Sequence, residues 1–127
     1  MQELVNNSAE FSIKRAVLLN VSAPFHCSLM MPAQIKLENK LKDIIFSDPD
    51  LPIICNYTAV AENNPLKLKE NIINQVTNKV RWKETMEYAL DKKINKVLEC
   101  GSGKVLSGLF KRFSKDFNVY NLSLIHI

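Results

Sequence analysis

Histidine is the side chain whose ordinary pKa lies near neutral pH, which suits it to general acid and base chemistry. The sequence has two, His26 and His126. His26 follows an apolar stretch and lies in a loop that contains Pro24. Loops that follow buried strands of α/β proteins often carry catalytic groups. His26 is therefore a candidate general base, with a capping or core histidine as the alternative, whereas His126 lies in an apolar terminal segment without such a context.

A histidine base needs a nucleophile to activate. The sequence contains no G-x-S-x-G elbow, the turn that presents the catalytic serine of α/β-hydrolases. Cys27 directly follows His26 and is the one conceivable substitute. Side chains of adjacent residues usually point apart, so we expect this chain to hold a base without its nucleophile.

The G-S-G-K stretch at residues 101–104 lies where a strand is predicted to lead into a helix, and helix N-termini attract anions. A phosphate-binding P-loop needs an earlier glycine, where this sequence has Leu98, and a Ser or Thr after the lysine, where it has Val105. We therefore favour a tight turn that lets the helix pack on the sheet over a nucleotide site.

The composition is that of one folded domain: 127 residues, 46% hydrophobic and 24% charged, with a formal net charge of +4. The lysines are spread along the chain, so we expect no nucleic-acid partner. Three cysteines fit neither a disulfide framework nor a zinc site. The apolar runs are shorter than the ~20 residues of a membrane helix, and the N-terminus lacks a basic secretory region. We expect no membrane association and a cytoplasmic location.

The elements that must position these groups alternate between strands and helices. The expected strands cover residues 14–22, 51–58, 94–100 and 118–127. The expected helices cover a short N-terminal stretch and residues 32–45, 65–76, 82–90 and 105–113. Residues 76–80 form helix poorly and divide two of these helices. This order indicates an α/β fold with a mainly parallel sheet.

Four motifs in order along the chain point to one family. Residues 21–33 read V-S-A-P-F-H-C-S-L-M-M-P-A, and residues 56–59 read N-Y-T-A. Residues 74–82 read N-Q-V-T-N-K-V-R-W, and residues 99–108 read E-C-G-S-G-K-V-L-S-G. Together they resemble the histidine motif, a strand end, the glutamine segment and the glycine turn of malonyl-CoA:acyl carrier protein transacylases. Lys79 and Ser102 replace prolines of that pattern, which removes backbone stiffness rather than a reacting group.

The resemblance covers about residues 1–113 and less than half of a transacylase, its C-terminal part. It implies that residues 1–22 are the last helix and strand of a ferredoxin-like subdomain. Residues 23–113 would be the C-terminal part of an α/β-hydrolase-like acyltransferase core, and residues 114–127 a divergent tail. The family's G-H-S-L-G elbow, its oxyanion-hole glutamine loop and the arginine that pairs with malonate have no counterpart here. We expect the apolar residues beside such missing strands to be unusually exposed: Val17, Leu18, Leu19, Ile53 and Ile54.

The resemblance also implies a reaction, in which a serine accepts malonyl from coenzyme A and passes it to the phosphopantetheine thiol of acyl carrier protein. His26 would be the general base and acid, and the backbone carbonyl of Gln75 would orient its ring. Malonyl-CoA would be a substrate, acyl carrier protein a partner, and no metal or cofactor would take part. We expect the full-length enzyme to be a monomer and this chain alone to be inactive.

Two alternatives stay open. One is a non-catalytic module that binds acyl carrier protein, because carrier proteins are usually acidic and the chain has basic residues at 92, 93, 111 and 112. Those four residues, Lys92, Lys93, Lys111 and Arg112, are equally explained as solvated charges on helix faces. The other is a small nucleotide-binding domain that uses residues 101–104, which the incomplete P-loop spacing disfavours.

Overall fold

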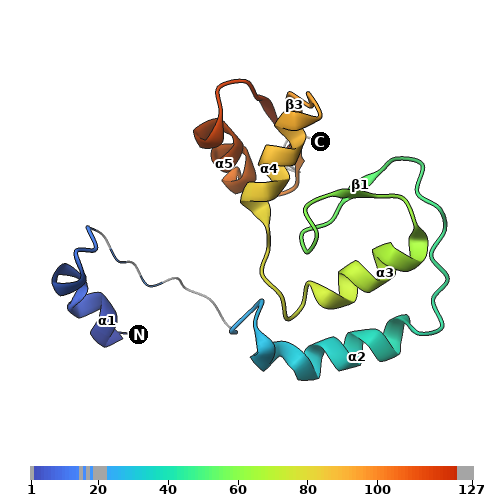
Figure 1. The fold of residues 1–127 in the computed structure, drawn as a ribbon, viewed down its shortest axis with the longest axis horizontal. Helices are drawn as coiled ribbons and strands as arrows, with labels where there is room; N and C mark the ends of the chain where they lie inside the picture. Colours follow the sequence, from blue (N-terminus) through green and yellow to red (C-terminus); the bar gives the residue numbers. More distant parts are fainter. Residues whose placement is uncertain (1, 15, 17, 19–22, 123–127) are drawn as a thin grey trace.

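The protein is a chain of helices and short strands, as the computed structural model in Figure 1 shows. The structure describes residues 2–14, 16, 18 and 23–122. The helices are α1 (Gln2–Asn6), α2 (Met31–Leu41), α3 (Pro65–Asn74), α4 (Trp82–Asp91) and α5 (Val105–Phe113), with short 3-10 turns η1 (Ser8–Phe11) and η2 (Ser28–Met30). The strands are β1 (Ile53–Ile54), β2 (Ala61–Glu62), β3 (Lys96–Cys100) and β4 (Asn118–Leu122). None of the helices in these residues is long and apolar enough to cross a membrane.

Helix α2 begins where Pro32 predicted, because proline fits the first turn of a helix, but it ends earlier than expected. The predicted helix ran to Ile45, whereas α2 ends at Leu41 and Ile45 is 92% exposed. The Lys69 ammonium on α3 donates to the carbonyl oxygens of Lys42 and Ile44, each at 3.0 Å. The Lys69 side chain therefore holds the segment after α2 against α3, and these two carbonyls accept from Lys69 rather than from a further turn of α2.

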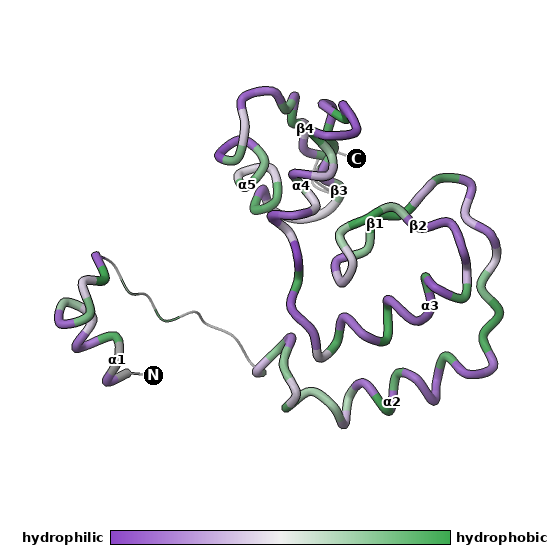
Figure 2. Tube along the Cα trace, viewed as in Figure 1, coloured by the Kyte–Doolittle hydropathy of each residue, from purple (hydrophilic) through white to green (hydrophobic). Residues whose placement is uncertain are grey.

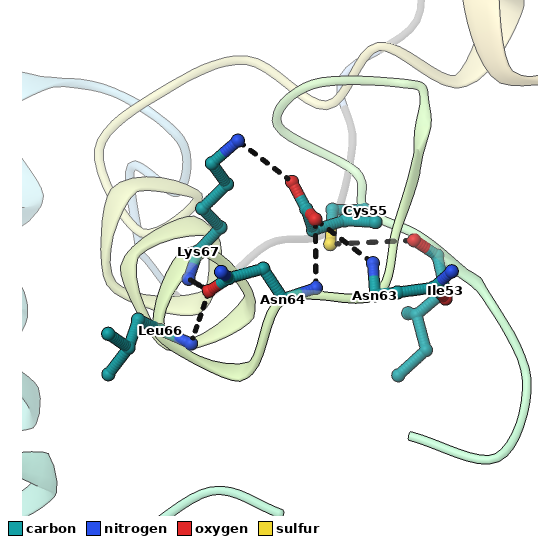
Figure 3. A network of polar contacts seen from close by, with 7 residues as sticks. Ile53, Cys55, Asn63, Asn64, Leu66 and Lys67 are labelled. Atoms are coloured by element: carbon teal, nitrogen blue, oxygen red, sulfur yellow. Dashed lines mark hydrogen bonds and ion pairs between the residues drawn. The ribbon is translucent and has the colours of Figure 1, made fainter. Parts of the chain in front are cut away.

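Helix α3 has a well-formed N-terminus, drawn in Figure 3. The Asn64 side-chain oxygen accepts hydrogen bonds from the backbone N–H groups of Leu66 and Lys67, at 2.9 and 3.1 Å. The carboxylate of Glu62 accepts from the backbone of Asn63 and Asn64 and forms an ion pair with Lys67 at 3.9 Å. These contacts fix the path from β2 into α3. Helices α3 and α4 are separate, as the weak helix formers at 76–80 predicted.

The expected sheet was mainly parallel, and this expectation was wrong for the first strands. β1 and β2 form an antiparallel pair, and only β3 and β4 run parallel. The expected strand at 51–58 is reduced to Ile53–Ile54 because the chain reverses soon afterwards. The Ala59 N–H donates to the Cys55 carbonyl at 2.8 Å, and Ala59 has a left-handed φ of 59°. This turn has no glycine at its left-handed position, so the usual sequence signal for it was missing.

The predicted strand at 14–22 falls largely outside the described residues, as do Val17 and Leu19. The described positions within it, Lys14, Ala16 and Leu18, are not in a strand. Leu18 and Ile53 are exposed, at 46% and 47%, as expected, whereas Ile54 is half-buried. His126 also lies outside the described residues.

The best-packed part of the chain consists of α4, β3, α5 and β4. Its core residues are Met86, Ala89, Phe110 and Phe117, each of them nearly fully buried. The ring of Phe110 meets the rings of Trp82 and Phe117 edge to face, with centroids 5.7 and 4.8 Å apart. A parallel strand, helix, strand unit therefore forms from residues 96–122, as the sequence predicted for 94–127.

Candidate functional site

His26 lies in a tight turn between the segment at 23–25 and the short helix η2. The Phe25 N–H donates to the Ala23 carbonyl at 2.9 Å, and His26 itself has a left-handed φ of 60°. That conformation is uncommon for a residue with a Cβ atom. The imidazole is exposed and its ring centroid is 6.5 Å from that of Phe25. The turn thus leaves the ring exposed rather than burying it in a core.

The imidazole makes one long-range hydrogen bond, to the backbone of Gln75. Its Nδ1 atom is 2.8 Å from the Gln75 carbonyl oxygen, across 49 positions of sequence. A carbonyl oxygen can only accept, so Nδ1 carries the proton and donates it to this bond. In the neutral imidazole this bond leaves the lone pair on Nε2, and a histidine with a free Nε2 lone pair can act as a base.

The Gln75 carbonyl is free to accept because α3 ends just before it. The Gln75 N–H still donates to the Asn71 carbonyl at 3.0 Å, so its N–H completes the helix. The last carbonyls of a helix have no partner within the helix. The Asn74 carbonyl takes bonds from the backbone and side chain of Asn78, at 3.2 and 2.8 Å, whereas the Gln75 carbonyl takes the bond from His26.

Two further contacts hold the segment after Gln75 in place. The Thr77 hydroxyl donates to the side-chain oxygen of Gln34, which lies on α2. The Arg81 N–H donates to the carbonyl of Asn56 at 2.9 Å, just beyond β1. Helices α2 and α3 also contact each other and lie side by side in Figure 1. The packing of α2 on α3 therefore brings His26 to Gln75.

Sequence reasoning missed Gln34, Thr77 and Asn56 as supports of this site. Thr77 and Asn56 lie inside the motifs at 74–82 and 56–59, but nothing in those motifs showed which atoms they contact. The signal for Gln34 was weaker, since a polar residue on an amphipathic helix usually faces solvent.

The candidate nucleophile Cys27 does not bond to His26. Its thiol donates instead to the carbonyl of Pro24, at 3.1 Å. Among the described residues the imidazole bonds to no serine or cysteine side chain. Cys55 is buried and Cys100 is exposed on β3. No group of three or more potential metal ligands gathers in the described part of the chain.

The glycine turn at 101–104 leads into α5, but a carboxylate of the chain already occupies the N-terminus of that helix. Glu99 accepts from the backbone N–H groups of Leu106 and Ser107, at 3.2 and 2.9 Å, and from the Ser107 hydroxyl. The Ser107 hydroxyl bond, and then the backbone bonds, lower the pKa of Glu99 below its ordinary value. A bound phosphate would have to displace this carboxylate. The site therefore offers little to a nucleotide, in line with the incomplete P-loop spacing.

The four basic residues of the carrier-protein hypothesis lie in two places. Lys92 and Lys93 follow α4, and Lys111 and Arg112 are in the last turn of α5. All four are exposed, and none forms an ion pair within residues 23–122. The Lys92 ammonium lies 5.6 Å from the centre of the Tyr88 ring. These charges are available to an acidic partner.

Comparison with known proteins gives a consistent result. No family model matches the chain. The malonyl CoA-acyl carrier protein transacylase of Bacillus subtilis is 38% identical over 122 residues, which is 91% of this chain and 30% of that protein. The crystal structure of acyl-carrier-protein-S-malonyltransferase from Bartonella henselae matches with a TM-score of 0.85 and 39% identity, over 94% of this chain and 38% of that one.

A third match is a solved complex of a malonyl-transacylase with its type II PKS acyl-carrier protein. It is 32% identical to this chain and has a TM-score of 0.83, over 97% of this chain and 39% of that one. The chain thus spans about a third of the length of the proteins it matches. Their shared content of helices and strands agrees with the mixed α and β architecture of the chain.

Proposed function

We propose that this chain has a catalytic role. The proposal starts from its resemblance to malonyl-CoA:acyl carrier protein transacylases, which is confirmed over the third of those proteins that the chain spans. In the transfer of malonyl from coenzyme A to acyl carrier protein, His26 of this chain is the base. The backbone carbonyl of Gln75 orients that histidine. The observation that carries this proposal is the 2.8 Å contact between His26 Nδ1 and the Gln75 carbonyl.

The proposed chemistry follows from the form of the imidazole that this contact selects. His26 Nε2 takes the proton of a serine hydroxyl as its oxygen attacks the malonyl carbonyl. The new C–O bond forms, the C–S bond of the thioester breaks, and the imidazolium returns the proton to the leaving thiolate. The second transfer reverses these steps with the carrier-protein thiol. The serine comes from polypeptide corresponding to the part of the relatives that this chain does not span.

The proposed role of Gln75 is to orient His26 rather than to touch the substrate. A fixed acceptor at Nδ1 keeps the ring in one tautomer and stabilises the imidazolium that forms during attack. A backbone carbonyl serves here where many hydrolases use a carboxylate. The supports from Gln34 and Asn56 hold the segment from Gln75 to Arg81, so the acceptor stays in place while the ring changes charge.

For the domain organisation we propose the division that the resemblance implies. Residues 1–22 are the end of a ferredoxin-like subdomain, and residues 23–113 are part of an α/β-hydrolase-like acyltransferase core. The segment 114–127 is the divergent tail. Within that tail β4 pairs with β3, which supports packing of its first residues on the core.

The proposed protein partner is acyl carrier protein, and the proposed substrate is malonyl-CoA. The solved complex of a related malonyl-transacylase with its carrier protein supports the first of these. The exposed Lys92, Lys93, Lys111 and Arg112 suit an acidic partner. We further propose that the protein acts in the cytoplasm, as a monomer when complete, and without a metal or cofactor. The competing hypothesis, a non-catalytic module that binds the carrier, uses the same basic residues but has no need of His26.

A chimera tests the catalytic proposal directly. This chain replaces the matched segment of the Bacillus subtilis transacylase, and malonyl transfer from malonyl-CoA to acyl carrier protein is measured. We expect transfer by the chimera and its loss when His26 is replaced by Ala. A folded chimera that binds carrier protein but transfers no malonyl would instead favour the non-catalytic module.

A further inference from the structure

The segment from Gln75 to Arg81 joins α3 to α4 and carries the carbonyl that His26 contacts. Figure 2 shows that this connection is mostly hydrophilic. Because the segment has no regular secondary structure, no helix or sheet ladder fixes the direction of its carbonyls. Its polar side chains include Thr77 and Asn78, which are of the types that bond to nearby backbone groups. These two side chains are therefore the candidates for holding the Gln75 carbonyl in place.

The side-chain amide of Asn78 makes two hydrogen bonds within this connection. Its Nδ2 atom donates to the carbonyl oxygen of Asn74 at 2.8 Å, and the backbone N–H of Asn78 donates to the same oxygen at 3.2 Å. The Nδ2 atom also donates to the hydroxyl oxygen of Thr77, at 3.3 Å. An amide NH₂ group has two hydrogens, so these side-chain bonds use both of them.

The Thr77 hydroxyl extends these contacts to α2. It accepts from the Asn78 amide and donates to the side-chain oxygen of Gln34. Gln34 lies in the first half of α2, the helix that follows the turn of His26. Three side-chain hydrogen bonds therefore join the end of α3, which presents the acceptor, to the helix that follows the histidine.

Two neighbouring carbonyls at the end of α3, those of Asn74 and Gln75, are potential acceptors for an imidazole N–H. A carbonyl oxygen has two lone pairs. At Asn74 the backbone and the side chain of Asn78 occupy both of them, whereas the Gln75 carbonyl accepts from His26. The contacts of Asn78 thus leave the Gln75 carbonyl as the acceptor for the ring.

We propose that Asn78 is a positioning residue for His26. Its amide holds the end of α3 so that the Gln75 carbonyl, and not the Asn74 carbonyl, accepts from Nδ1. The inference rests on the proposed function, in which this bond keeps the ring in its basic form. Without the amide, the Asn74 carbonyl regains a free lone pair and the connection loses its link to α2. The Nδ1–H group then has no fixed partner, and the neutral ring populates both of its tautomers.

Nitrogen NMR of the full chain measures the tautomer without any malonyl transfer. With isotope-labelled histidine only His26 and His126 give signals, and the His126→Ala variant assigns them. At about pH 9 the ring is neutral, and the chemical shifts of its two nitrogens give the fraction protonated at Nδ1. We expect Nδ1 protonation to predominate in wild-type His26. Asn78→Ala and the isosteric Asn78→Asp, which both lack the NH₂ group, should lower that fraction at least about twofold. An unchanged fraction in both variants would overturn the proposal.

Asn64→Ala is the matched control, because Asn64 caps the opposite end of α3. Loss of that cap destabilises the helix but leaves the contacts of Asn78 in place. We expect the Asn64→Ala variant to unfold at lower urea concentration, measured by circular dichroism, with an unchanged Nδ1 fraction at His26. Equal decreases of this fraction in the Asn64→Ala and Asn78→Ala variants would show a general loss of structure, and the proposal would be wrong.

Variants at Thr77 test the link to α2. Thr77→Val removes the hydroxyl at nearly constant size, and we expect it to lower the Nδ1 fraction of His26. Thr77→Ser keeps the hydroxyl and should restore the wild-type fraction. Equal fractions in the Thr77→Val variant and the wild-type chain would contradict the part of the proposal that places Thr77 between Asn78 and α2.

The chimera with the Bacillus subtilis transacylase separates this inference from the proposed function. There Asn78→Ala should lower kcat about tenfold with little change in KM, because the base is present but misplaced for part of the time. A chimera that transfers no malonyl, with an Nδ1 fraction that Asn78→Ala lowers, would support the positioning role and contradict the proposed function. Transfer that depends on His26, with the Nδ1 fraction and kcat both unchanged by Asn78→Ala, would do the reverse.

Discussion

The Nδ1 N–H of His26 donates a 2.8 Å hydrogen bond to the carbonyl oxygen of Gln75, where helix α3 has just ended. The two residues are 49 positions apart. The contact places the proton of the neutral imidazole on Nδ1. It depends on the turn in which His26 has a left-handed φ, and on helix α3, which ends one residue before Gln75.

Replacement of His26 by Ala in the chimera should lower turnover while leaving substrate binding nearly intact. General acid and base assistance is typically worth ~10²- to 10⁴-fold in rate. We expect kcat to fall within that range and KM to change little, measured by steady-state malonyl transfer. His126→Ala is the matched control and should change neither constant. A large rise in KM with constant kcat would show that His26 binds substrate instead.

Gln75→Ala should be far milder than His26→Ala, because the substitution keeps the backbone carbonyl that accepts the bond. We expect kcat of the chimera to fall by less than about tenfold, since only packing around the acceptor changes. The ratio of kcat values for the two variants is the measurement. Equal losses would show that the Gln75 side chain, rather than its carbonyl, orients the ring.

The chain by itself should not become labelled by malonyl-CoA. Cys27 is the nearest thiol in sequence, but it donates to the Pro24 carbonyl and has no hydrogen bond with His26. Incubation with radioactive malonyl-CoA, followed by denaturing gel electrophoresis, is expected to show no covalent label. Covalent label that disappears in the Cys27→Ser variant would show that this thiol is a nucleophile after all.

The acid stability of the chain should depend on Glu99. Its pKa is lowered in the folded state, first by the Ser107 hydroxyl and then by backbone N–H groups of α5. A lowered folded pKa means that the stabilisation is present above the ordinary carboxyl value of 4.5 and is lost as pH falls through the folded pKa. We expect the urea concentration at the unfolding midpoint of the wild-type chain, followed by circular dichroism, to decrease as the pH is lowered through this range.

Glu99→Gln should remove part of that pH dependence, because the neutral amide does not titrate. Its urea midpoint should lie below that of the wild-type chain at neutral pH and approach it in acid. Glu38→Gln is the matched control, since Glu38 is an exposed carboxylate on α2. Parallel pH profiles for the wild-type and Glu99→Gln chains would rule out a stabilising cap by Glu99.

Local patterns along the chain determined most of the elements. Proline at position 32, asparagine and proline at 64–65 and weak helix formers at 76–80 set the beginnings of α2 and α3 and the separation of α3 from α4. The unit from β3 to β4 was also predicted, because a short apolar strand, a glycine turn and an amphipathic helix are each local signals. The resemblance of the motifs at 21–33 and 74–82 further singled out His26 and Gln75.

Other features depended on contacts between distant residues, and only the tertiary structure decided them. Lys69 bonds to carbonyls 25 and 27 positions away in the segment just after α2, and a turn at Ala59 without glycine lets β1 and β2 pair in antiparallel. The residues themselves did not show that Gln75 faces His26, since its side chain resembles any polar surface residue. Such contacts join groups that local propensity treats separately. The contact of Thr77 with Gln34 forms only once α2 has packed on α3, and the contact of Arg81 with Asn56 forms only once the chain after β1 lies beside the segment before α4. Local patterns in the sequence did not show either contact.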